Sequence, residues 1–307
     1  MKKSIMLVAT LCVVAMMVAG CATMCGEKAG CQKACQAKTN MPAAEKLGFK
    51  VGCQAYSFNK FTFYEAIDKT AAAGFNYIEA YPGQALSPEK MDVKFDQNLP
   101  ADLQKEVLAK LEAANVKLVN YGVLGLGADE AENRKIFEFA KAMGIETITS
   151  EPKQEDLPAI DKLAQEYGIN VALHNHPKDS RYWNPDTVLE AVKGLSPRVG
   201  ACADTGHWMR SDINPVDGLK KLEGRIISLH FKDLNMYGKE AANKEDVHDV
   251  VWGTGKADVP ALLAELKRQG FKGVFSAEYE YDWLDSVPEL TESGQNFERI
   301  CQDLVKK

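Results

Sequence analysis

The chain has 307 residues, enough for one domain of roughly 200–250 residues or for two smaller domains. Apolar residues make up 46% and charged residues 26% of the sequence, a globular composition with ample material for a core. The net charge is −6 and no basic block occurs, which argues against nucleic acid as the partner, because a surface that follows phosphates needs clustered Lys and Arg. We therefore expect a small-molecule ligand and no nucleic acid.

The first twenty residues have the features of an export signal. Lysines stand at the second and third positions, and residues 5–18 form an apolar stretch too short for a convincing membrane-spanning helix. The stretch runs into Val-Ala-Gly-Cys, which resembles the bacterial lipobox, whose cysteine is diacylated and becomes the first mature residue. Residues 1–20 are therefore predicted to be a lipoprotein signal peptide, and the protein to be exported to the periplasm or cell surface and anchored in the membrane by lipid on Cys21. An ordinary secretory peptide cleaved near Ala22 is the alternative.

The next segment is rich in Ala, Lys, Gly and Gln and has no apolar period. It is predicted to be a flexible, cysteine-containing linker over residues 21–47, between the membrane and the folded domain. Its cysteines Cys25, Cys31 and Cys35 could form a disulfide in an oxidising compartment or bind a metal, or they could be incidental thiols.

From about residue 48 to the end, short apolar runs alternate eight times with amphipathic segments. The runs predict strands at 51–56, 77–80, 117–122, 147–151, 170–174, 199–203, 225–230 and 273–277. The amphipathic segments predict helices near 62–73, 101–114, 129–143, 157–167, 185–193, 215–222, 259–269 and 292–305. Eight strand–helix pairs in about 260 residues predict one (β/α)8 TIM barrel over residues 48–307. A doubly wound open sheet is the alternative, but it typically has about five to seven strands.

Polar residues of similar type follow the last five predicted strands. They are Glu151, His174 with His176, Asp204 with His207, His230 with Lys232, and Glu278 with Glu280. The C-terminal ends of all strands of a barrel meet around one mouth, where catalytic groups gather. A lone strand-end histidine or acid is usually a structural or helix-capping residue, but five such ends in succession indicate a shared site. Mixed histidine and carboxylate ligands favour Mn²⁺, Zn²⁺, Co²⁺ or Fe²⁺ over Ca²⁺.

These motifs together resemble the xylose isomerase-like TIM barrel superfamily, which includes sugar epimerases, sugar isomerases, inosose dehydratases and type IV endonucleases. The resemblance covers residues 48 to about 300 and rests on Leu173-His174-Asn175-His176, Ala203-Asp204-Thr205-Gly206-His207, Leu229-His230-Phe231-Lys232-Asp233, Gly253-Thr254-Gly255 and Ala277-Glu278-Tyr279-Glu280. It implies a divalent metal, most simply Mn²⁺, Zn²⁺ or Co²⁺, bound by Asp204, His230 and Glu278.

The fourth ligand departs from the family pattern. Many relatives have Glu-Asn-His after strand five, where this chain has His174-Asn175-His176. His174 could bind the metal directly, or Glu151 could supply a carboxylate from the neighbouring strand. In sugar epimerases the glutamate of strand five moves a proton together with the glutamate of strand eight. Glu278 is therefore a catalytic candidate, but this chain has no glutamate at the strand-five position to pair with it.

The resemblance implies a metal-dependent isomerase or epimerase that removes a proton next to a metal-polarised carbonyl of a sugar or keto-sugar. His176 and His207 are the candidate bases, since imidazole titrates near neutral pH. Lys232 could stabilise an enediolate oxygen, or it could be a solvated loop lysine. Four aromatic residues are expected either to stack on the sugar or to pack under the loops: Tyr182, Trp183, Trp208 and Trp252.

Other functions stay open. An exported 3-keto-glycoside lyase or hydratase could use the same barrel, and so could a lipoprotein that binds sugar without turning it over. A type IV endonuclease is disfavoured, because it normally needs three metals and a DNA-binding surface. This chain is acidic and has only five histidines to bind metals. A homo-oligomer is compatible with the sequence.

Overall fold

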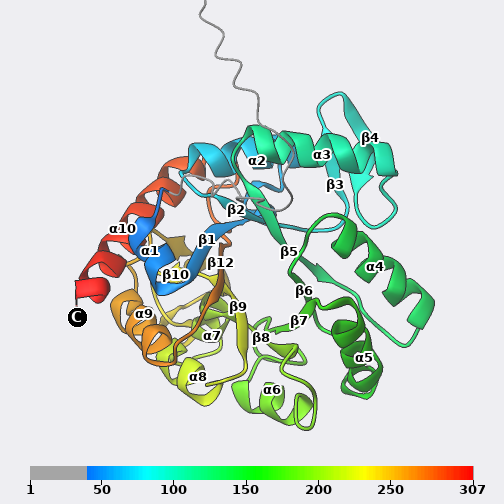
Figure 1. Ribbon diagram of the computed structural model, residues 1–307. Helices are drawn as coiled ribbons and strands as arrows, with labels where there is room; N and C mark the ends of the chain where they lie inside the picture. Colours follow the sequence, from blue (N-terminus) through cyan, green and yellow to red (C-terminus); the bar gives the residue numbers. More distant parts are fainter. Residues whose placement is uncertain (1–39, 307) are drawn as a thin grey trace, which may run out of the picture. The chain divides into compact units, whose positions relative to one another are not determined.

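The computed structural model describes residues 40–306, and within them eight parallel strands close into a barrel with helices around it (Figure 1). The neighbours around the barrel are β1-β12-β9-β8-β7-β6-β5-β2. Their bounds are β1 Phe49–Gln54, β2 Tyr77–Ala80, β5 Lys117–Leu124, β6 Thr147–Ser150, β7 Asn170–His174, β8 Val199–Asp204, β9 Ile226–Phe231 and β12 Gly273–Ala277. The predicted TIM barrel is confirmed, and the alternative, a doubly wound open sheet, is excluded by the closure between β1 and β12.

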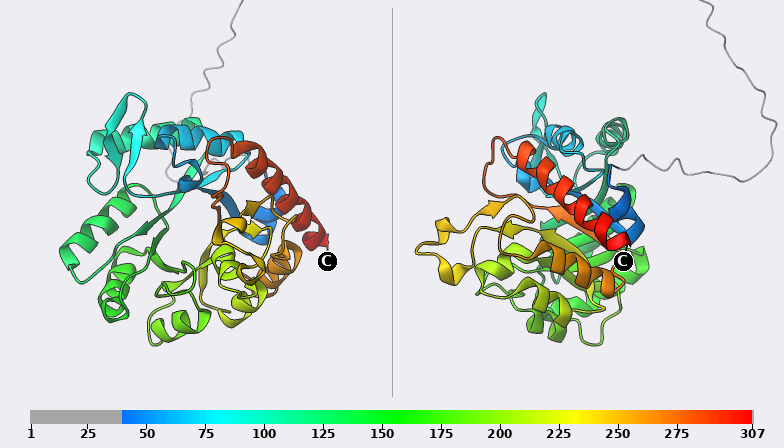
Figure 2. Two further views of the ribbon diagram at one scale, coloured as in Figure 1. Left: turned by 180° about the vertical axis from the view of Figure 1, so that it is seen from behind. Right: turned by 90° about the vertical axis from the view of Figure 1, so that its left-hand side faces the viewer.

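Helices follow the strands and form the outer ring of the barrel (Figures 1 and 2). They are α2 Phe63–Ala72, α3 Ala101–Ala113, α4 Glu130–Ala142, α5 Leu157–Tyr167, α6 Pro185–Ala191, α8 Pro215–Lys221, α9 Val259–Arg268 and α10 Val287–Lys306. Local sequence fixes many of their ends. Thr62 and Glu65 form a capping box at the start of α2, and Gly144 takes a positive φ just after α4.

A short helix precedes the barrel, where the sequence predicted a linker. α1, Pro42–Leu47, packs against α10, and the carboxylate of Glu298 accepts hydrogen bonds from the backbone N–H groups of Ala43 and Ala44. The predicted linker boundary is therefore wrong for residues 42–47, because Pro42 begins a helix whose two alanines are buried. The predicted signal peptide, Cys21, Cys25, Cys31 and Cys35 lie outside the described residues.

Extra elements decorate the C-terminal ends of some strands. A hairpin of β3 Gln84–Ser87 and β4 Lys90–Phe95 follows β2, and the short strands β10 Asp233–Leu234 and β11 Asp249–Val250 pair after β9. The yellow segment that carries β10 and β11 projects from the barrel in the right-hand view of Figure 2. A short helix, α7 Thr205–Arg210, follows β8 directly. The remaining single turns are η1 Ala55–Phe58, η2 Gln154–Asp156, η3 Gly238–Glu240 and η4 Lys244–Asp246.

The Gly253-Thr254-Gly255 turn is built around Asp233. The Asp233 carboxylate accepts hydrogen bonds from the backbone N–H groups of Gly253, Gly255 and Ala257. A Cβ on Gly255 would lie 2.3 Å from Asp233 Oδ1, so only glycine fits there. This motif therefore shapes the loop above β9 and supplies none of the predicted metal ligands.

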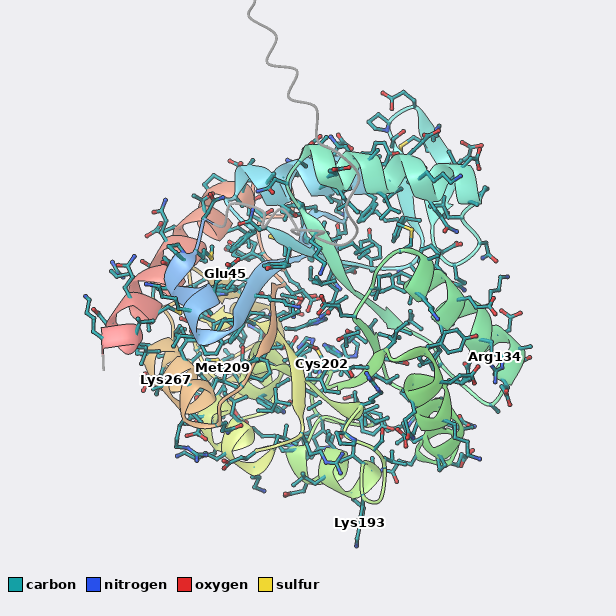
Figure 3. All side chains as sticks on the ribbon, in the orientation of Figure 1. Glu45, Arg134, Lys193, Cys202, Met209 and Lys267 are labelled. Atoms are coloured by element: carbon teal, nitrogen blue, oxygen red, sulfur yellow. The ribbon has the colours of Figure 1, made fainter. Side chains whose placement is uncertain are left out.

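The apolar core lies between the barrel and its helices. A group of aromatic rings joins β1, β9 and β12 to α10 through Phe49, Phe231, Phe275 and Phe297. Figure 3 shows side chains filling the ring of strands, with Cys202 of β8 near the barrel centre and Arg134 and Lys193 at the periphery. Among the helices of residues 40–306, none has the length and apolarity to cross a membrane.

Candidate metal centre

Four buried side chains converge at the C-terminal ends of neighbouring strands. His174, Asp204 and His230 end or nearly end β7, β8 and β9, and Glu278 follows β12 directly. Each offers one donor atom, and the four atoms lie within 4.8 Å of one another. His174 Nε2 lies 3.6 Å from Asp204 Oδ2, and His230 Nδ1 lies 3.1 Å from Glu278 Oε2. The parallel register brings this about, since Asp204 is the direct neighbour of His230 across β8 and β9.

Neighbouring polar residues clamp the backbone at these positions. The amide of Asn175 accepts from Asp204 N at 2.8 Å and donates to Asp204 O at 3.0 Å. The hydroxyl of Ser57 donates to Ala277 O and accepts from Tyr279 N, on either side of Glu278. These bonds satisfy the strand-end backbone groups and hold the carboxylates in place.

His230 is oriented from inside the barrel by a glutamate that sequence reasoning missed. Its Nε2–H donates to Glu79 Oε1 of β2 at 3.1 Å. Glu79 is fully buried and also accepts from Thr149, Ser276 and Asn120. Burial alone would raise the pKa of Glu79, but His230 and these hydroxyls lower it, so the group is a carboxylate. Since Glu79 can only accept, His230 Nδ1 is the nitrogen left for the cluster.

His174 is oriented in the same way from the outer side. Its Nδ1 is bonded to Glu151 Oε1 at 2.9 Å, and Glu151 also contacts His176 Nδ1. Burial would raise the pKa of Glu151, but the two histidines outweigh it and lower that pKa to about 2. Glu151, His174 and His176 thus form a second group of possible ligands. Toward the four-residue cluster, Glu151 is not a ligand but the residue that orients the His174 ring.

The four-residue cluster fits a divalent cation. His174 Nε2 is buried and has no hydrogen-bond partner among the described residues, and it faces Asp204. Burial would lower the pKa of His174, yet Asp204 and Glu151 raise it to about 9. The same negative surroundings favour a metal ion. Two imidazole nitrogens and two carboxylates suit Mn²⁺, Zn²⁺ or Co²⁺.

Lys232 is part of this cluster and not a solvated loop lysine. Its side chain is fully buried, and its Nζ lies 3.1 Å from Asp204 Oδ2, 2.8 Å from Glu278 Oε2 and 3.0 Å from Glu280 Oε2. Burial would lower the pKa of Lys232, but these carboxylates hold it well above its usual value. The ammonium is therefore charged.

The two candidate bases flank a cavity of about 390 Å³ above the cluster. His176 is half-exposed, and His207 is nearly buried with its Nε2 3.7 Å from Asp204 Oδ2. Burial lowers the pKa of His207 well below its usual value; the Asp204 carboxylate opposes this effect and Lys232 adds to it, so His207 is neutral. A neutral imidazole can accept a proton, and His207 Nδ1 has no partner within residues 40–306.

Of the two roles considered for the aromatic residues, packing under the loops holds for three of the four. Tyr182, Trp208 and Trp252 are buried and pack under the loops, so a sugar-stacking role is wrong for them. Trp183 is partly exposed, but it is absent from the residues that line the cavity. The cavity is instead lined by Tyr56 and Tyr81, which follow β1 and β2. Tyr56 is 40% exposed, and its ring lies 5.3 Å from that of Tyr81 and 5.7 Å from that of Trp283. These rings form a partly exposed aromatic rim.

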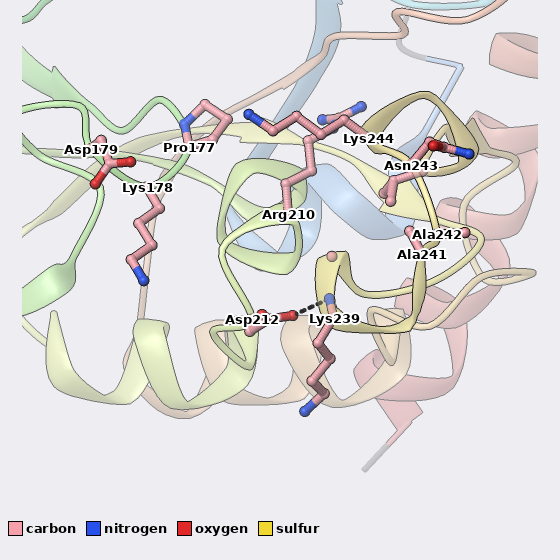
Figure 4. A pocket seen from close by; sticks show the side chains of 12 residues that line it. Pro177, Lys178, Asp179, Arg210, Asp212, Lys239, Ala241, Ala242, Asn243 and Lys244 are labelled. Carbon is pink, nitrogen blue, oxygen red and sulfur yellow. Dashed lines mark hydrogen bonds between the residues drawn. The ribbon is translucent and has the colours of Figure 1, made fainter.

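A second hollow of about 460 Å³ lies beside the mouth (Figure 4). It is lined in part by Lys178, Arg210, Lys239 and Lys244. Arg210 connects the hollow to the site, since its guanidinium is 3.2 Å from buried Asp249 and 3.9 Å from Glu280. Lys178 and Lys239 extend away from Arg210 in Figure 4, so the cations do not converge on one point.

Comparison with solved structures supports the architecture. An uncharacterised protein of Parabacteroides distasonis is 34% identical, and the match covers 83% of this chain and 99% of that one with a TM-score of 0.66. The IOLI protein, solved with a binding zinc atom, has the same fold at 18% identity, with 84% of this chain and 98% of that one covered and a TM-score of 0.60.

Curated relatives align over part of their length. The rhizopine catabolism protein MocC of Rhizobium meliloti is 25% identical over 226 residues, which are 71% of this chain and 66% of that protein. An inosose dehydratase of Salmonella typhimurium is 28% identical over 162 residues, 50% of this chain and 53% of that enzyme. The chain therefore spans about half to two thirds of the length of these relatives. Residues 67–301 match one family along nearly the whole barrel: the chain belongs to the xylose isomerase-like TIM barrel family.

Proposed function

We propose that this protein is a metal-dependent enzyme that moves a proton next to a carbonyl group of a sugar or keto-sugar. The observation that carries the proposal is the cluster of His174, Asp204, His230 and Glu278 beneath a cavity that also holds His176 and His207. A divalent ion bound by the four residues would polarise the substrate carbonyl and acidify the adjacent C–H. The zinc atom in the IOLI protein is in keeping with such an ion.

The remaining side chains supply the other parts of such a reaction. Neutral His207 is the favoured base, because it lines the cavity and has an unpartnered ring nitrogen within the described residues. His176, bonded to Glu151, is a second base that is open to solvent. The Lys232 ammonium lies directly behind Glu278 and Glu280, which line the cavity, and would stabilise negative charge on an enediolate oxygen that reached it. Tyr56 and Tyr81 offer rings against a sugar face.

The positions of the bases favour isomerisation over epimerisation. The rings of His176 and His207 are 5.2 Å apart, so both stand on the β7–β8 side of the mouth. Two bases on one side support removal and return of a proton on one face of the substrate, as in an aldose–ketose isomerase. Epimerisation would need a second base on the opposite face, for which Glu278 is the candidate, although Lys232 and His230 already engage it.

A dehydratase or lyase is the second candidate. Loss of a proton next to a carbonyl can be followed by loss of a β-hydroxyl or glycosyl group, and inosose dehydratases are among the relatives. With export, the substrate would be an unphosphorylated sugar or a 3-keto-glycoside. A sugar-binding lipoprotein without turnover would retain the same pocket.

One experiment separates these functions. The purified protein, supplied with Mn²⁺, Co²⁺ or Zn²⁺, is incubated in D₂O with free sugars, keto-cyclitols and 3-keto-glycosides and followed by NMR. Isomerisation gives a new sugar that carries deuterium, whereas elimination gives a product that lacks a hydroxyl or glycosyl group. His207→Asn should lower either rate by at least about a hundredfold. Ligand binding without turnover, by protein shown to contain no metal, would contradict the enzyme proposal.

The lipid anchor has its own test. We propose attachment through Cys21 because the sequence that ends there resembles a lipobox. Cys21→Ser should move the protein from the membrane to the soluble fraction, with Cys25→Ser as the matched control. Unchanged membrane partition of Cys21→Ser would refute the anchor.

A further inference from the structure

The Lys232 ammonium contacts the two oxygen atoms that Asp204 and Glu278 contribute to the four-residue cluster. Asp204 Oδ2 lies 3.6 Å from His174 Nε2 and 3.1 Å from Lys232 Nζ. Glu278 Oε2 lies 3.1 Å from His230 Nδ1 and 2.8 Å from Lys232 Nζ. A metal ion bound by the four ligands would therefore share both oxygens with a buried ammonium group. Two cations this close in a buried site repel strongly.

The fold holds Lys232 in this place through the Asp204-Thr205-Gly206-His207 segment. The Thr205 hydroxyl accepts from Lys232 N at 2.9 Å and donates to Lys232 O at 2.7 Å, which fixes its backbone. Gly206 leaves room for the lysine stem, because a Cβ there would lie 2.8 Å from both Cβ and Cδ of Lys232. Thr205 and Gly206, which follow the candidate ligand Asp204, thus fix the position of Lys232.

A third carboxylate contacts the Lys232 ammonium in the same position. Glu280 Oε2 lies 3.0 Å from Lys232 Nζ, lines the cavity and belongs to neither group of candidate ligands. Arg210, which is bonded to Asp249, lies 3.9 Å from that same Oε2 atom, so a second cation holds this oxygen beside Lys232. Glu280 can therefore keep the ammonium at the cavity wall when Asp204 and Glu278 are engaged elsewhere.

We propose that Lys232 is an internal counter-cation that competes with the metal ion for Asp204 and Glu278, and that Glu280 retains the ammonium when the metal binds. The competition weakens metal binding and keeps the two buried carboxylates neutralised in metal-free protein. Transfer to Glu280 leaves the ammonium beside the cavity, where it can meet a substrate oxygen. The inference rests on the proposed metal site but concerns affinity and not the reaction.

Metal affinity tests the proposal without any substrate. Co²⁺ and Zn²⁺ are titrated into metal-free full-length protein in competition with a chromophoric chelator. Lys232→Met, which keeps the stem and removes the charge, should bind metal at least tenfold more tightly than wild type. Glu280→Gln should bind metal at least threefold more weakly. Lys193→Met, a substitution at the exposed periphery, is the matched control and should change nothing.

The double variant separates retention of Lys232 from the simple loss of a negative charge. If Glu280 acts by holding Lys232, Glu280→Gln should have less than a threefold effect in the Lys232→Met background. An equal effect in both backgrounds would overturn the role of Glu280. Unchanged or weaker metal binding by Lys232→Met, with a native circular dichroism spectrum, would overturn the competition itself.

Failure of the proposed function would look different. If wild type binds no metal and Lys232→Met does, competition is supported and metal-dependent catalysis by the natural protein is contradicted. If neither protein binds metal, both proposals fail.

Discussion

Each of the two histidines of the cluster is hydrogen-bonded to a glutamate, but the two glutamates differ in burial. His230 bonds Glu79 inside the barrel, where the carboxylate is fully buried and accepts hydrogen bonds from Asn120, Thr149 and Ser276. His174 bonds Glu151 at the rim, where the carboxylate is 20% exposed and also contacts His176. The inner glutamate therefore fixes one histidine, whereas the outer glutamate connects the other histidine to a residue that lines the cavity. The inner pair should govern stability and metal affinity together, and the outer pair should govern metal affinity and catalysis.

The largest expected effect follows removal of the inner histidine. His230→Ala deletes a proposed ligand and leaves Glu79 as an unpaired buried charge, which should cost about 3–5 kcal/mol of unfolding free energy. Metal binding should be lost. His174→Ala should also lose tight metal binding but cost less stability, because water can reach Glu151. Chelator competition and urea unfolding measure both, and full metal occupancy in His230→Ala would remove His230 from the ligands.

Glu79→Gln should have the next largest effect. The amide cannot accept as many bonds from its buried neighbours, so the unfolding free energy should fall by about 1–3 kcal/mol. Metal affinity should fall about 10–100-fold, because His230 loses the group that fixes its tautomer. Metal affinity within twofold of wild type would show that Glu79 has only a structural role.

Glu151→Gln should be milder. Metal affinity should fall by about tenfold, the lower end of the effect of groups that orient a ligand. The unfolding free energy should fall by less than in Glu79→Gln, because the Glu151 carboxylate is 20% exposed and water screens its pairing with the histidines. If Glu151→Gln instead lost metal binding completely, Glu151 would be a ligand, and the contrast between the inner and outer glutamates would break down.

His176→Asn should have the smallest effect on binding. Because His176 is half-exposed and lies outside the four-residue cluster, metal affinity should stay within about threefold of wild type. The turnover number should fall if His176 moves a proton. A loss of metal affinity equal to that of His174→Ala would place the ion at Glu151, His174 and His176 instead.

The sequence predicted the barrel well because each strand is a short apolar run between amphipathic helices. Strands β2, β7 and β12 have the predicted bounds at both ends. The meeting of His174, Asp204, His230 and Glu278 followed from one rule, that parallel strands of a barrel end at the same mouth. The α1 helix was missed because its six residues lie next to a stretch without apolar period.

Other parts of the site depend on packing between strands. Glu79 looked like one polar residue in the apolar run of β2, although an acid within a strand buried on both faces is a signal of a buried partner. The burial of Lys232 depends on Thr205 and Gly206 of the neighbouring segment, which no pattern along one strand reveals. The burial of Tyr182 and Trp208 likewise depends on the direction in which their loops turn.

Anomalous diffraction from crystals grown with Co²⁺ or Zn²⁺ tests the central claim most directly. We expect one strong peak at about 2.0–2.2 Å from His174 Nε2, His230 Nδ1 and carboxylate oxygens of Asp204 and Glu278, with Glu79 and Glu151 behind the two rings. A peak between Glu151, His174 and His176, or no ordered ion at a saturating metal concentration, would contradict it.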